Sequence, residues 1–347
     1  MAELPRGDNP PQPPAVLPRG DNPPQPPAVS ADLYRTVRLI RRFEERAIEL
    51  VRGGVIPGGI HPYIGEEAIA AGVCAALRAD DLITSTHRGH GHVLAKGADP
   101  ARVLAELAGR ETGLNAGRGG SMHAADVSVG IYGANAIVGA SAAIACGAAW
   151  SHRRAGHDRV AVTFFGDGAV NQGVLLEALN LASLRRLPVI FVCENNQFAT
   201  SMRVQDTTSG TITGRAEAFG IPAESLDGMD AEAVLEAASR AVARARAGDG
   251  PTFLECLTYR FGPHHTWEYS VRPRYRTDEE VAAGSDRDPV AIQAARVAGA
   301  VRSRIDAEIE DLLDRARLFA EASPEPDPSG ALDYLYSGAL RGRGGTA

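Results

Sequence analysis

The sequence predicts an α/β fold with a mainly parallel sheet and helices on both faces. Two apolar runs, Val160–Phe165 and Leu187–Cys193, have the length and composition of buried strands, and one helix-length segment separates them. A strand, a helix and a second strand in this order form a βαβ unit, whose two strands run parallel. Further strands are predicted at Asp81–Thr86 and Pro251–Arg260, so the same alternation extends along the chain.

The predicted helices alternate with these strands. Asp32–Arg52 carries apolar residues at helical spacing with basic residues between them. Further helices are predicted at Glu66–Leu77, Pro100–Gly109, Ala140–Arg153, Asp230–Ala247 and Arg304–Ala322. Asp230 is the expected N-cap of its helix. The remaining segments are expected to be loops, namely Gly53–Pro62, His87–His92, Gly113–His123 and Gly262–Arg276.

A tandem repeat sets the N-terminus apart. LPRGDNPPQPPAV occurs at Leu4–Val16 and again at Leu17–Val29. Proline prevents helix formation and the repeat has little apolar surface, so a disordered proline-rich tail is expected over residues 1–30. A docking role for the tail is the alternative. We expect one domain over residues 31–328 and a C-terminal tail over 329–347.

The composition excludes several classes of protein. The chain has 347 residues and a net charge of −7, which argues against a nucleic-acid partner. No run of eighteen apolar residues and no signal peptide is visible, so we expect a cytoplasmic protein without a membrane partner. Its four cysteines lie far apart and are interpreted as buried thiols.

Polar residues follow both strands of the βαβ unit. Asp167 lies in a Gly-Asp-Gly turn after the first strand, and Asn195-Asn196 ends the second. Both ends lie at the edge of the sheet where open α/β folds bind ligands. Mg²⁺ prefers oxygen ligands, which Asp167, Asn196 and the carbonyl of Phe198 would supply beside a phosphate at the helix start. An ordinary Asx turn is the alternative, but the paired motifs favour a metal-bound diphosphate.

Histidines form a second group. The segment His87–His92 reads HRGHGH and could form a zinc site, a phosphate clamp or a solvated turn. We favour the phosphate interpretation, because the guanidinium of Arg88 matches phosphate geometry. His61 and His264-His265 could transfer protons near neutral pH or be structural.

Several segments carry a family resemblance. They are IPGGIHPYIGEEA (56–68), ITSTHRGHGHVLAKGAD (83–99), GRGGSMH (117–123), GANAIVGA (133–140), GDGAVNQG (166–173) and PVIFVCENN (188–196). Together they resemble the α subunits of the heterotetrameric 2-oxo acid and acetoin dehydrogenases, the pyruvate dehydrogenase α-subunit family. The resemblance runs from about Leu33 to Asp327. The segment THRGHGH…AKGAD is most similar to that of acetoin dehydrogenase α subunits.

The resemblance implies a thiamine diphosphate-binding fold and assigns roles to individual residues. It implies Mg²⁺ bound by Asp167, Asn196 and the Phe198 carbonyl, and catalytic roles for His61 and His264. The implied cofactor-binding residues are His87, Arg88, Ala136, Val138, Gly166, Asp167, Gly168, Ala169, Gln172, Asn196 and His264.

The resemblance also implies partners. A separate, transketolase-like β subunit would supply the glutamate on the pyrimidine side of the cofactor within an α₂β₂ tetramer, so the chain alone is expected to be inactive. The implied acceptor is a lipoyl carrier on an acyltransferase.

Three functions follow from these observations. The first is an α subunit that cleaves or decarboxylates acetoin or a small 2-oxo acid and passes the acyl unit to a lipoyl carrier. The second is a two-subunit thiamine-dependent carboligase or lyase without that carrier. The third, a scaffold without a cofactor that binds partners through its proline-rich tail, is disfavoured because Asp167, Asn196 and Arg88 are present. The unusual segment Gly262–Tyr275 leaves the substrate open, and the residue after His264 is not a serine that could be phosphorylated.

Overall fold

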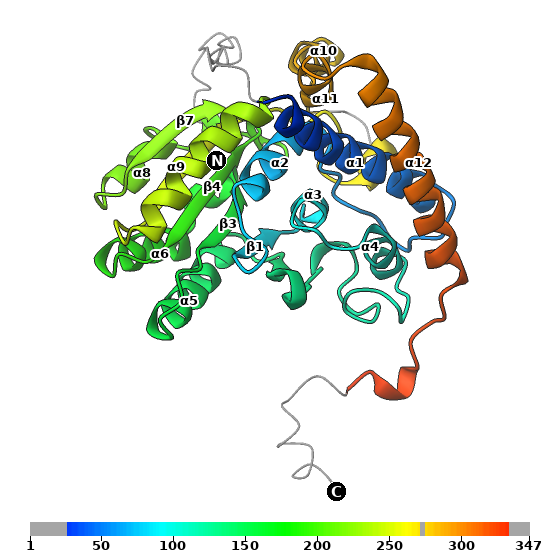
Figure 1. Cartoon of the computed structure of the whole chain (residues 1–347), viewed down its shortest axis with the longest axis horizontal. Coiled ribbons are helices and arrows are strands. Elements are labelled where there is room, and N and C mark those ends of the chain that lie inside the picture. The colour runs from blue at the N-terminus through cyan, green and yellow to red at the C-terminus, as the bar shows by residue number, and fades with distance from the viewer. Residues whose placement is uncertain (1–25, 271–274, 333–347) are drawn as a thin grey trace, which may run out of the picture.

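The computed structural model describes residues 26–270 and 275–332, and its centre is a parallel sheet (Figure 1). The sheet has six strands in the order β2-β1-β3-β4-β8-β7, and every neighbouring pair is parallel. The strands are β1 (Leu82–Thr86), β2 (Ile131–Asn135), β3 (Ala161–Gly166), β4 (Val189–Asn195), β7 (Ala223–Asp227) and β8 (Thr252–Leu257). Two further strands, β5 (Phe198–Ala199) and β6 (Met202–Arg203), pair with each other to form a small antiparallel ribbon. The predicted fold class is confirmed.

Helices cover both faces of the sheet (Figure 1). One face packs against α5, α6 and α8, and the other against α9, with α1, α2 and α3 beyond it. The helices are α1 (Pro27–Arg52), α2 (Glu67–Ala75), α3 (His90–Ala95), α4 (Pro100–Leu107), α5 (Ala140–Arg154), α6 (Gly173–Leu184), α7 (Val204–Thr207), α8 (Ile212–Glu217), α9 (Ala231–Arg246), α10 (Asp278–Ser285), α11 (Pro289–Ala294) and α12 (Gly299–Ala322).

The apolar run of β3 is buried on both sides. Val162 and Phe164 belong to the hydrophobic core under α9, whereas Ala161 and Phe165 belong to the core under α5 and α6. Successive side chains of a strand point to opposite faces, so a strand between two helical layers is apolar throughout. This explains why the strand appears in the sequence as a continuous apolar run.

Some boundaries differ from the prediction. Helix α1 begins at Pro27, five residues before the expected start at Asp32, and the remaining tail residues 1–25 lie outside the described part of the chain. The expected loop His87–His92 is only partly a loop, because α3 begins at His90. Strands β2 and β7 were not predicted. Both are short strands at the edges of the sheet with several exposed or small residues, so neither forms an apolar run.

The cysteine prediction is confirmed, because Cys74, Cys146, Cys193 and Cys256 are all buried and free. Burial raises the pKa of the Cys74 and Cys146 thiols to about 12, which keeps them protonated and unreactive. Among the described helices, none is long and apolar enough to cross a membrane.

Close packing between α2 and α9 requires a glycine. A Cβ at Gly72 would lie 2.6 Å from the carbonyl oxygen of Ala231 and 2.7 Å from the Cβ of Val234. Both contacts are shorter than van der Waals distance, so the two helices approach each other only because position 72 has no side chain. This contact connects α2, in the outer helical layer, to α9, which packs directly on the sheet.

We predict that Gly72→Ala lowers the free energy of unfolding by about 1–3 kcal/mol, because the added methyl group overpacks this contact. Gly147 in α5 provides a matched control, since a Cβ there would meet no atom within 4 Å. Gly147→Ala is expected to leave stability unchanged or to raise it by about 0.5–1 kcal/mol through helix propensity. Denaturant unfolding measures both. A Gly72→Ala variant as stable as Gly147→Ala would contradict the packing argument.

Candidate active site

The candidate site lies at the carboxyl edge of the sheet, where the chain leaves β1, β2, β3, β4 and β8. A cavity of about 240 Å³ opens there. Every residue that the sequence predicted to hold the cofactor or the metal lines this cavity. His61 does not line the cavity, although its ring packs against residues that do. Parallel strand pairing therefore brings the predicted residues together from distant parts of the sequence.

Asp167 has an unpaired carboxylate oxygen in the cavity wall. It follows β3 directly and is 1% exposed. Its Oδ1 accepts a hydrogen bond of 2.8 Å from the backbone N–H of Gly168, whereas Oδ2 is buried without a hydrogen-bond partner among the described residues. Burial raises the pKa of Asp167 to about 6. An unpaired buried oxygen is costly unless a ligand binds it, so this atom fits a cation.

Asn196 and Phe198 lie beside Asp167 on a tight turn after β4. The Oδ1 of Asn196 accepts a hydrogen bond of 3.1 Å from the backbone N–H of Phe198. Between them, Gln197 has a φ of +75°, a conformation uncommon for residues other than glycine. Strained backbone of this kind is often found at ligand sites. Carboxylate, amide and carbonyl oxygens are the donor set that Mg²⁺ prefers.

Two buried arginines line the cavity together with the acidic residues Glu66, Asp167 and Glu194. Arg88 and Arg260 both line it and are 4% and 1% exposed. Burial and the charge of Arg88 lower the pKa of Arg260 to about 10. The carboxylate of Glu66 lies 3.7 Å from the Nε of Arg88. Buried guanidinium groups of this kind fit an anion with several oxygens, such as a diphosphate.

The backbone around Gly168 and Gln172 is open to an anion. A Cβ at Gly168 would lie 2.7 Å from the Cβ of Ala199, so only glycine fits without displacing the β5 turn. Gln172 is the N-cap residue of α6 and its side chain caps no N–H group of the helix. The first N–H groups of α6 are therefore available, and helix N-termini favour negative charge.

The opposite wall comes from the chain after β2. Ala136 and Val138 line the cavity, and the Oδ1 of Asn135 fixes their loop by accepting a hydrogen bond of 2.8 Å from the N–H of Ile137. Ile137 and Val138 are 69% and 49% exposed, although both are large apolar residues. This rim is therefore an apolar surface open to solvent in the isolated chain.

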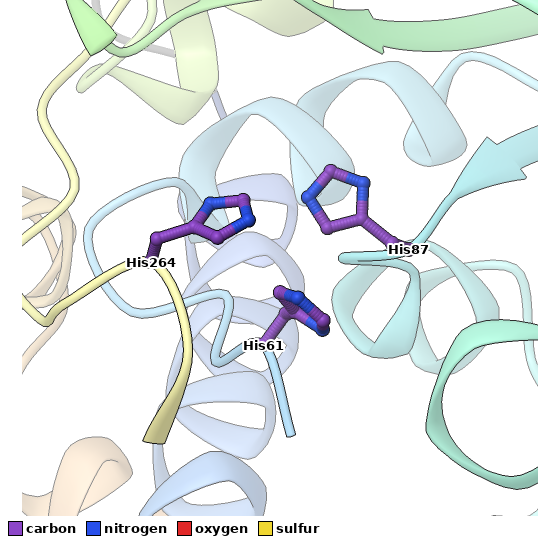
Figure 2. Close-up of side chains that lie close together, drawn as sticks. All are labelled: His61, His87 and His264. Carbon is purple, nitrogen blue, oxygen red and sulfur yellow. The ribbon is translucent and has the colours of Figure 1, made fainter. Parts of the chain in front are cut away.

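Four histidines lie close together beside the cavity, and two of them, His87 and His264, line it. Figure 2 shows the rings of His61, His87 and His264 converging from three segments, and one nitrogen from each lies within 4.8 Å of the others. The ring of His265 lies 4.6 Å from that of His61. Burial, with the positive charge of Arg88, lowers the pKa of His61 and His264 to about 2 and that of His87 to about 3. These rings are therefore neutral at physiological pH.

The hydrogen bonds of His264 define its tautomer. Its Nδ1 accepts from the Nη2 of Arg88 at 3.2 Å and from the Nη1 of Arg260 at 3.4 Å. Arginine only donates, so the ring proton of neutral His264 resides on Nε2. The same arginine charges oppose a cation among the histidines, which makes Asp167 the better metal site.

The other histidines of the HRGHGH segment are structural. His90 is fully buried, and its Nδ1 lies 3.0 Å from the carboxylate of Glu44. His92 is also fully buried and lies 2.9 Å from the carboxylate of Glu194. Neither lines the cavity, because both belong to α3 and point into the core. Of this segment, only His87 and Arg88 reach the site.

Among the charged residues that line the cavity, sequence reasoning missed Glu66, Glu194 and Arg260. Glu66 lines the cavity and accepts a hydrogen bond of 3.0 Å from the Nδ2 of Asn196. Burial raises the pKa of Glu66 to about 8. Glu66 lies within the matching IGEEA segment, and Arg260 ends the predicted last strand. A basic residue at the carboxyl end of a buried strand was the available signal for Arg260.

We predict that Asp167→Asn abolishes binding of the metal diphosphate without lowering the stability of the ligand-free protein. The amide keeps an oxygen for the N–H of Gly168 and replaces the unpaired, charged carboxylate oxygen by a neutral NH₂ group, whose burial costs less than that of a charge. Without ligands the variant should unfold at the same or a higher temperature than the wild type. Added Mg²⁺ and thiamine diphosphate should raise the melting temperature of the wild type, in complex with its partner subunit, but not that of the variant.

Asp230→Asn is the matched control. Asp230 accepts two hydrogen bonds of 2.6 Å from Arg296 and caps α9, so its removal should lower the melting temperature but preserve the ligand-induced increase. A ligand-induced increase that survives in Asp167→Asn would rule out Asp167 as a ligand.

The buried histidines should make the fold sensitive to acid. In the unfolded chain each histidine binds a proton below about pH 6.5, whereas His61 stays neutral in the native state down to about pH 2. The unfolded state therefore binds more protons, and stability falls as the pH decreases below 6.5. His61→Asn should reduce this dependence, as measured by unfolding free energies at pH 7, 6 and 5. Parallel curves for the variant and the wild type would contradict a neutral His61.

Comparisons with known proteins agree with this geometry. The family model described as dehydrogenase E1 component matches residues 35–329. The α subunit of acetoin:2,6-dichlorophenolindophenol oxidoreductase from Cupriavidus necator is 43% identical, over 88% of this chain and 93% of its own. The corresponding subunit from Bacillus subtilis is 42% identical, over 88% and 92%. The pyruvate dehydrogenase E1 component subunit α from Rhizobium meliloti is 41% identical, over 85% and 86%. The chain therefore belongs to the dehydrogenase E1 component family, whose enzymes depend on thiamine diphosphate.

Proposed function

We propose that this chain is the α subunit of a thiamine diphosphate-dependent acetoin dehydrogenase. The observation that carries the proposal is the unpaired Oδ2 of Asp167 in a cavity that also contains two buried arginines. Such a cavity suits a metal ion bound to a diphosphate. Acetoin is favoured over a 2-oxo acid because relatives with 43% and 42% identity are named for acetoin.

In this proposal Mg²⁺ binds to Asp167, the side-chain oxygen of Asn196 and the carbonyl of Phe198. The diphosphate pairs with Arg88 and Arg260, and with the N–H groups near Gly168 and at the start of α6. Both sets of residues line the same cavity, which supports a shared site. Residues 31–328 would form this cofactor-binding unit.

When bound, thiamine diphosphate supplies a nucleophilic carbon and an electron sink for cleavage of a carbon–carbon bond. The chain contributes hydrogen-bonding groups around that chemistry. His264, with its proton on Nε2, is a neutral donor that can hold a substrate oxygen. The Nδ1 of His61 and the Nε2 of His87 are buried without partners among the described residues, so both can take part in further hydrogen bonds.

A β subunit would complete the site. The exposed apolar rim at Ile137 and Val138 borders the cavity, and Tyr132 and Ile144 on β2 and α5 are 41% and 43% exposed. Exposed apolar surface beside a ligand cavity is typical of a subunit interface. We propose an α₂β₂ assembly in which the β subunit covers the pyrimidine side, with a lipoyl acyltransferase as the physiological acceptor.

Co-expression with a β subunit tests the proposal. The purified complex with Mg²⁺ and thiamine diphosphate should reduce 2,6-dichlorophenolindophenol in the presence of acetoin, and faster than with pyruvate or branched 2-oxo acids. The α chain alone should show no turnover, because in this proposal the β subunit supplies the pyrimidine-side glutamate. Formation of acyloin without dye reduction would contradict a dehydrogenase, and turnover by the α chain alone would contradict the need for a partner.

A further inference from the structure

Asn195, which ends β4, and Asn196, which follows it, are held in the same way. In each, Oδ1 accepts from the backbone N–H two residues later, at 3.2 Å for Asn195 and 3.1 Å for Asn196. In each, Nδ2 donates to a buried glutamate, Glu255 at 2.8 Å for Asn195 and Glu66 at 3.0 Å for Asn196. The Asn196–Glu66 pair lines the cavity, whereas the Asn195–Glu255 pair does not. The same hydrogen-bond arrangement is therefore found both inside and outside the site.

The direction of an amide depends on its partners. The oxygen and nitrogen of an asparagine side chain are almost equal in size, so hydrogen bonding decides which one faces a given group. Glu66 is 1% exposed and accepts the N–H of Asn196. With Nδ2 bound to Glu66 and one lone pair of Oδ1 used by Phe198, the second lone pair of Oδ1 remains for a ligand.

Glu66 is itself held in place. It is the N-cap residue of α2, whose closely packed neighbour is α9, and its carboxylate lies 3.7 Å from the Nε of Arg88. The side chain thus lies between the candidate metal ligand Asn196 and the candidate diphosphate partner Arg88. Mutation of a group that orients a metal ligand in this way typically costs about 10–100-fold in metal affinity or activity.

We propose that Glu66 is a positioning residue that orients the amide of Asn196, so that its oxygen rather than its nitrogen faces the metal. The inference rests on the proposed function, because it needs Mg²⁺ at Asp167 and Asn196. Without the acceptor of Glu66, the amide can rotate and present its N–H₂ group, which cannot bind a cation. The affinity for Mg²⁺ then falls although every ligand residue is still present.

The experiment measures Mg²⁺ affinity directly, by calorimetric titration of MgCl₂ into the metal-free α/β complex saturated with thiamine diphosphate. Glu66→Leu removes the acceptor and should raise the Kd for Mg²⁺ by about 10–100-fold. Glu66→Gln keeps an acceptor oxygen at the same place, and its Kd should stay within about threefold of the wild type. Glu66→Asp shortens the side chain by one methylene group and should fall between these two.

Glu255→Leu is the matched control. It removes the same kind of hydrogen bond from Asn195, outside the cavity, so it should lower the melting temperature without changing the Kd for Mg²⁺. A shared loss of affinity in the Glu66 and Glu255 variants would indicate a general structural effect and overturn the proposal.

The remaining outcomes are equally decisive. A wild-type Kd in Glu66→Leu would overturn the positioning role of Glu66. If Glu66→Leu fails to assemble, Glu66→Asp decides, and a wild-type Kd in that variant would likewise overturn the role. If the wild-type complex itself binds neither Mg²⁺ nor thiamine diphosphate, the proposed function fails, and the result differs from that of a Glu66 variant that binds like the wild type.

Discussion

The parallel pairing of β3 with β4 is the constraint on which the site depends. It places Gly166 opposite Glu194 at the carboxyl edge of the sheet, so the residues that follow each strand are neighbours. Asp167 and Asn196 therefore meet although a whole crossover helix separates them in sequence. The same edge receives the chain from β1, which contributes His87 and Arg88, from β2, which contributes Ala136 and Val138, and from β8, which contributes Arg260 and His264. The scaffold determines these positions, and the loops supply the chemistry.

The site is an arrangement that lowers the stability of the free chain. A carboxylate oxygen of Asp167 is buried without a partner among the described residues, and Arg88 and Arg260 are close enough for one to lower the pKa of the other. Each feature is unfavourable in isolation and becomes favourable when a cation and an anion bind together. A metal diphosphate supplies both charges. Binding of the metal diphosphate therefore relieves two unfavourable features of the free chain, the unpaired carboxylate oxygen and the neighbouring arginine charges, and this relief contributes to the binding free energy.

Sequence reasoning identified the parts of the site that follow from local pattern. Asp167 and Asn196 follow apolar runs, so the βαβ unit predicts where they meet. Glu66 was missed because its role depends on how α2 packs against its neighbouring helices, which no local pattern reveals. His90 could not be distinguished from His87 by sequence. The two differ because α3 begins at His90, and its first turn directs the His90 side chain into the core. Edge strands were missed for a similar reason, since pairing on one side leaves no continuous apolar run.

The central claim is that a metal ion binds between Asp167, Asn196 and Phe198. The most direct test is a crystal structure of the α/β complex with thiamine diphosphate and Mn²⁺ in place of Mg²⁺, because Mn²⁺ has the same preference for oxygen ligands and gives anomalous scattering. A metal ion bound there should give an anomalous peak at these three residues, about 2.0–2.3 Å from the Oδ2 of Asp167. A peak among His61, His87 and His264 instead, or none at Asp167, would contradict this claim.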